Sequence, residues 1–387
     1  MAMPGCMTAE PNNVRGSASG RKPNVIVILA DDLGYADVGF NGCKDIPTPN
    51  IDSLARNGVR CSNGYVSHPF CSPTRAGLLT GRYQQRFGHE CNPAWLPEDN
   101  KVGLPLNQVT IAQAVRDAGY VTGAIGKWHL GAAPCFHPNE RGFSEYFGFL
   151  GGGHIYMPGD KGGAEYTVPV LRNKQPVEQK EYMTDLLSSE AVSFITRHKS
   201  EPFFLYLAYN AVHTPLQAPE KYLNRFKDIA DEKRRTYAAM NSAMDDGIGR
   251  LLKALRENGL EENTMVWFFS DNGGPPANVV PTNNSPLRGN KGMVYEGGVR
   301  VPFVVQWRGK LPEGRVYDEP VISLDVLATS VAVAGAKVPA SHKLDGVNIV
   351  PYLCGGQNGA PHDVLHWRSG GSAGKWAVRE GRYKQLK

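Results

Sequence analysis

Short apolar runs that end abruptly in polar residues constrain the fold of this chain more than any other feature. Each run is rich in β-branched or aromatic residues and is bounded by turn-forming residues, a pattern typical of a buried strand. We therefore predict buried strands at Val25–Ala30, Tyr120–Gly126, Phe203–Tyr209, Val266–Ser270 and Val301–Trp307.

Segments with a helical spacing of apolar residues lie between these runs. We predict helices over Thr110–Ala118, Tyr182–His198 and Asp231–Asn258, and Gly259 is placed to end the last of them. Strands that alternate with helices indicate an α/β fold, in which a central, mostly parallel mixed sheet is sandwiched by helices. Ligands collect at the carboxyl ends of the strands in such sheets, so the residues that follow the runs are candidates for a site.

The length of 387 residues suits one large domain with a small one beside it. We expect a flexible leader over residues 1–22, a main domain over 23–355, and the start of a small C-terminal subdomain over 356–387. Two hairpin-forming strands, Asp363–Trp367 and Trp376–Lys387, predict a small antiparallel sheet there. The chain stops before further strands could follow, so we expect this subdomain to be incomplete.

Composition excludes several classes of protein. With 41% hydrophobic and 20% charged residues the chain is not disordered, and no apolar run approaches the roughly 20 residues that span a bilayer. The net charge of +5 comes without a basic block, which favours a small or polymeric anion over nucleic acid as the partner. Seven scattered cysteines without a CxxC pair argue against a structural zinc site and a disulfide scaffold, and leave one or two bridges open.

Carboxylates and an amide at two strand ends predict a metal site. Asp31 and Asp32 follow the first run, and Asp271 and Asn272 follow the fourth. Oxygen ligands suit Ca²⁺ or Mg²⁺, whereas zinc prefers His or Cys. A single pair of this kind more often caps a helix or forms a turn than binds a metal. Two such pairs, each at the end of a buried strand, favour a metal.

Basic residues gather near the same strand ends. A metal surrounded by cationic side chains implies an oxyanion ligand whose charge is neutralised from several sides. Taken singly, a histidine is more often structural and a lysine in a Gly-rich loop is more often solvated, so the prediction rests on the whole set. Its members are Arg75, Lys127, His129, His213 and Lys291.

The segment His68–Arg82 carries the most distinctive pattern. Pro73 opens a predicted helix, so Cys71 is expected just before its N-terminus, where the helix dipole favours an anion, with Arg75 one turn away. On these residues alone, a thiolate nucleophile and a buried structural cysteine are both open.

The run from Cys71 to Arg75 (CSPTR), followed by LTGR at 79–82, resembles the signature of the type I sulfatases. In that family the cysteine of C-x-P-x-R is oxidised to Cα-formylglycine. The resemblance implies an alkaline-phosphatase-like fold, makes residues 23–355 the catalytic domain and predicts a sulfuric ester hydrolase. Other segments resemble the metal strands, the Lys-x-His segment and the lysine loop of the family in the same order, namely Pro23–Gly39, Gly123–Gly131, Phe268–Gly274 and Arg288–Pro302.

The resemblance also implies a role for each matched residue. Arg75 and Lys127 would stabilise the hydrated formylglycine and the sulfate, and His129 would act as base on the gem-diol. His213 and Lys291 would hold sulfate oxygens, and one of them would protonate the leaving alcohol. A formylglycine-generating enzyme is the implied partner in maturation. One Ca²⁺, or alternatively Mg²⁺, would be held by Asp31, Asp32, Asp271, Asn272 and an oxygen of the modified residue 71.

The substrate implied is a sulfated carbohydrate or another sulfate ester, because the pattern looks like that of bacterial sulfatases of polysaccharide breakdown. Candidate substrate-binding residues are His89, His154 and Arg288, and for the two histidines a structural role is equally open. The resemblance implies a periplasmic or secreted location. Residues 1–22 nevertheless lack the apolar stretch of a signal peptide.

Three other functions stay open on the sequence. The same scaffold and signature serve phosphonate monoester and phosphodiester hydrolases, whose tetrahedral substrates differ from sulfate esters mainly in charge. A catalytically inactive relative that binds sulfated glycans is the second. A thiol-based enzyme is the third, and it predicts inactivation by alkylating agents.

Overall fold

The computed structural model describes residues 20–387, and its centre is a ten-stranded mixed sheet. Of the predicted leader, only residues 20–22 fall within the described part. Five neighbouring strands run parallel, as expected for the core of an α/β sheet. In spatial order they are β9 (Thr264–Ser270), β1 (Asn24–Ala30), β8 (Phe203–Ala208), β4 (Val121–Lys127) and β5 (Glu145–Phe149).

The flanks of the sheet depart from the parallel arrangement. Strand β10 (Phe303–Gln306) pairs antiparallel with β9. The sheet continues through β2 (Val59–Cys61) to β11 (Arg315–Tyr317) on that side, and through β6 (Val170–Arg172) to β7 (Gln175–Val177) on the other. The predicted mostly parallel mixed sheet is therefore confirmed.

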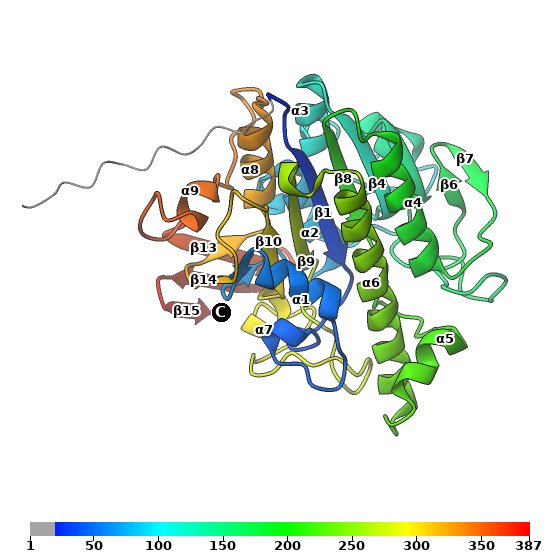
Figure 1. Ribbon diagram of the computed structural model, residues 1–387. Coiled ribbons are helices and arrows are strands. Elements are labelled where there is room, and N and C mark those ends of the chain that lie inside the picture. Colours follow the sequence, from blue (N-terminus) through cyan, green and yellow to red (C-terminus); the bar gives the residue numbers. More distant parts are fainter. Residues whose placement is uncertain (1–19) are drawn as a thin grey trace, which may run out of the picture.

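Helices cover both faces of the sheet. Successive side chains of a strand point to opposite faces, so the apolar strands need an apolar partner layer on each side. Along β1, Val25, Val27 and Leu29 pack in one apolar cluster, and Ile26 and Ile28 pack in the other. Helices α2 (Cys71–Thr80), α3 (Ile111–Asp117) and α8 (Asp325–Ala334) contribute to the first cluster. Helices α1 (Pro49–Arg56), α4 (Met183–Arg197) and α6 (Glu232–Glu257) contribute to the second, and α4 runs beside α6 (Figure 1).

The predicted helices begin and end within a residue of the expected positions. Thr110 caps α3 through a capping box with Gln113. Asp231 caps α6 by accepting a hydrogen bond from the backbone NH of Arg234, 2.7 Å away. Gly259 follows the end of α6 with φ of 66°, a left-handed conformation that glycine adopts at low cost.

The remaining elements are short. Strand β3 (Gly64–Tyr65) pairs with β12 (Val321–Ile322) in a separate two-stranded sheet. The short α-helices are α5 (Glu220–Leu223), α7 (Glu296–Val299) and α9 (Val350–Leu353). Single turns of 3₁₀-helix lie at Gly39–Asn41, Gln84–Phe87, Pro134–Phe136, Pro138–Arg141, Asn224–Phe226 and Glu261–Asn263.

A small antiparallel sheet closes the described chain, as predicted. It consists of β13 (Val364–Ser369), β14 (Lys375–Glu380) and β15 (Tyr383–Leu386), at one side of the main sheet in Figure 1. The predicted single strand Trp376–Lys387 is divided, because Gly381 takes φ of 54° and turns the chain. The indole of Trp367 anchors this sheet by donating to the carbonyl of Val66, 2.8 Å away.

Two findings for residues 20–387 concern the cysteines and the apolar helices. The six cysteines of this range are all free thiols, so the bridges left open above do not form among them. None of the helices in the same range combines the length and the apolar character that a bilayer crossing requires.

Candidate active site

The carboxyl ends of the parallel strands bring the predicted polar residues to one edge of the sheet. Asp31 and Asp32 follow β1, Asp271 follows β9, and His213 lies in the segment after β8. Backbone hydrogen bonds fix these ends to one another, from Asp31 NH to the Ala211 carbonyl (2.9 Å) and from Asp271 NH to the Ala30 carbonyl (3.0 Å). The three segments therefore present their side chains to a common space.

Helix α2 brings Cys71 to this edge. The helix begins at Cys71 itself, so the predicted start after this residue is wrong. Phe70 is extended, with φ of −133° and ψ of 155°, and its carbonyl accepts the first helical hydrogen bond from Thr74 NH. Cys71 consequently occupies the first turn, where backbone NH groups and the helix dipole favour an anion.

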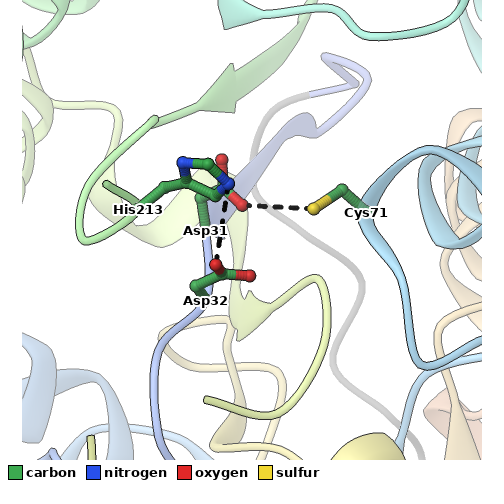
Figure 2. Close-up of side chains that lie close together, drawn as sticks. All are labelled: Asp31, Asp32, Cys71 and His213. Atoms are coloured by element: carbon green, nitrogen blue, oxygen red, sulfur yellow. Dashed lines mark hydrogen bonds and ion pairs between the residues drawn. The ribbon is translucent and has the colours of Figure 1, made fainter. Parts of the chain in front are cut away.

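Cys71, Asp31, Asp32 and His213 form a compact cluster. One ligand atom from each lies within 4.8 Å of the others. The thiol of Cys71 lies 3.6 Å from Asp31 Oδ1, and His213 Nε2 lies 3.7 Å from Asp32 Oδ2. Figure 2 shows the two aspartates after strand β1, with Cys71 and His213 reaching toward them from separate segments.

Asp271 and Asn272 adjoin this cluster and complete an oxygen-rich donor set. Asn272 donates through Nδ2 to Asp32 Oδ1 at 2.7 Å. Its own Oδ1 is buried and has no hydrogen-bond partner among the described residues. A buried carbonyl oxygen beside three carboxylates lacks a donor, and a hard cation would satisfy it. The residues present therefore fit Ca²⁺ or Mg²⁺.

Three basic side chains contact the carboxylates. Lys127 Nζ lies 2.5 Å from Asp31 Oδ2, and Arg75 Nη2 lies 2.7 Å from Asp271 Oδ2. Lys291 Nζ lies 2.6 Å from Asp32 Oδ1. Three carboxylates and three cations give the cluster no net charge, so a divalent cation would make it positive. An anionic ligand would then be attracted to it.

Burial and these charges shift the acidities in the cluster. Burial alone would raise the pKa of Asp31, but Lys127 and its neighbouring cations hold it well below its usual range. Burial, together with repulsion from Asp31, raises the pKa of Asp271 to about 6. Burial beside Asp271 raises the pKa of the Cys71 thiol to about 12, so Cys71 carries a neutral thiol at neutral pH.

His129 is held as a neutral imidazole beside the cluster. Burial lowers its pKa well below the usual range, and Lys127 and Arg75 lower it further. Its Nδ1 is buried without a partner among the described residues. The other edge of the ring lies against Gly152, where an added Cβ would be only 2.6 Å from Nε2. Only glycine leaves room for the ring in this position.

A cavity of about 350 Å³ opens onto these groups, which is large enough for a small ligand or one sugar ring. Cys71, His129 and His213 line part of it. The remaining wall comes from four stretches of the chain, and its residues are Asn92, Pro93, Ala94, Trp95, Gly131, Ala132, Leu150, Gly151, Gly152, Gly153, Glu165 and Tyr166.

The three residues predicted to bind substrate lie elsewhere, and that role stays a prediction. His89 is buried behind the start of α2, with Nε2 2.7 Å from the hydroxyl of Ser72. The ring of His154 lies between the carbonyls of Ile155 and Val168, at 2.8 and 2.9 Å. Arg288 is exposed and stacks on Tyr295. None of the three is among the residues that line the cavity.

Other wall residues escaped the sequence interpretation. Trp95 and Glu165 lie in segments without regular spacing, so no pattern marked them. The glycine run at 151–153 was visible in the sequence and signals close approach of the backbone, but nothing in it indicated that His129 is the neighbour.

Known proteins resemble this chain over nearly its whole length. The family profile described as Sulfatase matches residues 23–336. The uncharacterized sulfatase YdeN of Escherichia coli is 33% identical over 89% of this chain, and human N-acetylgalactosamine-6-sulfatase is 33% identical over 88%. The chain spans about two thirds of these relatives, at 68% and 67% of their lengths.

Among solved structures, Ps i-CgsB in complex with k-i-k-neocarrahexaose superposes with a TM-score of 0.89 and 44% sequence identity. This likeness covers 95% of the present chain and 84% of the other. The profile match and the identities agree with the ordered motifs and with the fold. The chain belongs to the type I sulfatases, a family of enzymes in the alkaline phosphatase superfamily.

Proposed function

We propose that this sulfatase releases inorganic sulfate from a sulfated glycan through a formylglycine formed at Cys71. The observation that carries the proposal is the position of Cys71, buried at the first turn of α2 and at the wall of the cavity, 3.6 Å from Asp31. A thiol with its pKa raised to about 12 is a poor nucleophile, which argues against a thiol-based enzyme. An aldehyde hydrate at the same position needs no thiolate. A formylglycine-generating enzyme is the proposed maturation partner.

The proposed metal is one Ca²⁺, with Mg²⁺ as the alternative. Asp31, Asp32, Asp271 and Asn272 would hold it, together with an oxygen of the modified residue 71. The unpartnered Oδ1 of Asn272 and the carboxylates of Asp31 and Asp32, which belong to the compact cluster, support this assignment. Such an ion would supply positive charge for the sulfate oxygens and for the nucleophilic oxygen.

A formylglycine at residue 71 would, as its hydrate, supply the hydroxyl oxygen that displaces the alcohol from sulfur; the proton of that hydroxyl would pass to water, and a water molecule would restore the hydrate after sulfate leaves. Arg75, Lys127 and Lys291 neutralise the sulfate oxygens. His213 or Lys291 gives a proton to the leaving alcohol. His129 would take the proton of the remaining hydroxyl, which would allow the carbon–oxygen bond to sulfate to break. The neutral state of His129 and its unpartnered Nδ1 support its role as base.

A sulfated carbohydrate is the proposed substrate class. The similar structure of Ps i-CgsB was solved in complex with k-i-k-neocarrahexaose, and a similar human protein is named N-acetylgalactosamine-6-sulfatase. The cavity of about 350 Å³ suits a sugar ring better than an extended chain, and it opens directly onto Cys71.

The proposal is tested by comparing sulfate and phosphonate esters. Matured enzyme is expected to hydrolyse 4-nitrophenyl sulfate with a higher kcat/KM than 4-nitrophenyl phenylphosphonate, and Cys71→Ala should abolish sulfate release. Cys354→Ser, which changes an exposed thiol, serves as the matched control and should keep wild-type activity. Preference for the phosphonate would favour the rival hydrolase, and inactivation of the matured enzyme by iodoacetamide would favour a thiol mechanism.

A further inference from the structure

The wall of the cavity carries two aromatic side chains from segments far apart in the sequence. Trp95 lies in the segment between Cys91 and Gly103, and Tyr166 lies in the segment between Gly151 and Val168. Both are partly buried, so each keeps part of its ring surface accessible to a ligand. Flat aromatic surface beside a polar site is well suited to the C–H face of a sugar ring.

Contacts with neighbouring residues fix the positions of both aromatic side chains relative to Cys71 and His213. Asn92 Oδ1 accepts a hydrogen bond from Ser72 NH at 3.0 Å, which ties the segment of Trp95 to the start of α2. The ring of Tyr166 lies 6.5 Å from that of His213, measured between centroids. It also lies so close to Gly153 that an added Cβ would be 2.5 Å from Cε1. These contacts place the two rings on the same cavity as Cys71.

Glu165 gives this wall a negative charge. It is the one acidic residue among those that line the cavity, and it precedes Tyr166. It takes part in none of the ion pairs found within residues 20–387, so its carboxylate is available to a ligand. The carboxylates of the metal cluster are instead matched by Arg75, Lys127 and Lys291.

We propose that Trp95, Tyr166 and Glu165 form a sugar subsite that selects a pyranose with a single sulfate. The aromatic rings would pack against the apolar face of the sugar, and Glu165 would accept a hydrogen bond from a free hydroxyl. A second sulfate at that hydroxyl brings like charges together and removes the donor, so the disulfated sugar is rejected by both effects. This inference rests on the proposed function and adds a specificity for the number of sulfate groups on the sugar.

The test compares the ratio of kcat/KM between paired substrates. The probes are oligosaccharides whose terminal galactose, glucose, N-acetylgalactosamine or N-acetylglucosamine carries one or two sulfates, with 4-nitrophenyl sulfate as the sugar-free reference. Wild-type enzyme is expected to prefer the monosulfated member, and Glu165→Gln should reduce that preference by about tenfold or more, since a charge is lost and an acceptor is kept. Glu98→Gln, an exposed residue of the Trp95 segment that does not line the cavity, is the matched control.

The contribution of Trp95 and Tyr166 is measured separately, through KM. Trp95→Ala and Tyr166→Ala should raise KM for the sugar sulfate by about tenfold relative to any change with 4-nitrophenyl sulfate. Equal changes on both substrates, or an unchanged preference in Glu165→Gln, would overturn the subsite. Hydrolysis of 4-nitrophenyl sulfate with none of the sugar sulfates would also overturn it and leave sulfate ester hydrolysis standing. Hydrolysis of neither would instead overturn the proposed function.

Discussion

Replacement of Gly152 by alanine should displace the imidazole of His129, the proposed base. The added Cβ would lie 2.6 Å from His129 Nε2 and 2.8 Å from Cε1, whereas ordinary contact begins at 3.4 Å. The ring must therefore move by about 0.8 Å, a displacement comparable with those that cost enzymes about a hundredfold in rate.

The backbone of His129 cannot absorb this displacement easily. Its φ is 58°, its NH donates to the Leu150 carbonyl at 3.1 Å, and its carbonyl accepts from the Ser72 hydroxyl at 2.5 Å. The imidazole is buried, so the ring must leave its position relative to Cys71. We expect kcat for 4-nitrophenyl sulfate to fall by about 10- to 100-fold.

The assay combines steady-state kinetics with thermal unfolding. Gly163→Ala is the matched control, because an added Cβ there meets no atom within 4 Å. The decisive comparison is a double-mutant cycle, in which Gly152→Ala should add little to the loss caused by His129→Ala, since the collision partner is gone. Wild-type kcat in Gly152→Ala, or fully additive losses in the cycle, would refute the reasoning.

The remaining predictions concern stability. Treatment with a chelator should lower Tm and activity, and Ca²⁺ should restore both, because three buried carboxylates and an unpartnered amide oxygen lose their cation; an unchanged Tm would contradict the metal site. Burial would lower the pKa of His362, but the buried Asp325 carboxylate, 2.7 Å away, raises it above 6.5. Its stabilisation is therefore complete below about pH 6.5 and is lost as pH rises through the folded-state pKa. His362→Asn should cost about 1–3 kcal/mol in urea unfolding at pH 6 and less at pH 9, and equal costs would argue against a charged pair. Thr110→Ala should cost about 1 kcal/mol through loss of the α3 cap, with Thr110→Ser as the control near wild type.

The sequence predicted five of the ten strands of the main sheet, and the polar cluster at the strand ends, because both depend on local pattern. Apolar runs such as Val25–Ala30 form strands whatever surrounds them, and the polar residues after parallel strands meet at one edge by topology. Strand direction depends on the connection, so the antiparallel pairing of β10 could not be read from the run Val301–Trp307.

Several residues of the cavity wall could not be predicted from the sequence, for a different reason. Trp95, Glu165 and Tyr166 come from irregular segments, whose shape is set by tertiary contacts such as that between Asn92 and Ser72. His154, a candidate for substrate binding, is likewise placed by tertiary contacts, since its two ring nitrogens face the carbonyls of Ile155 and Val168.

The most direct test of the account is the mass spectrum of the tryptic peptide Cys61–Arg75 after co-expression with a formylglycine-generating enzyme. Cys61 lies in the same peptide and serves as an internal control thiol. We predict conversion of Cys71 alone to the aldehyde, with specific activity toward 4-nitrophenyl sulfate rising in proportion to the converted fraction. An unmodified Cys71 under conditions that mature a known sulfatase, or activity independent of conversion, would contradict the central claim.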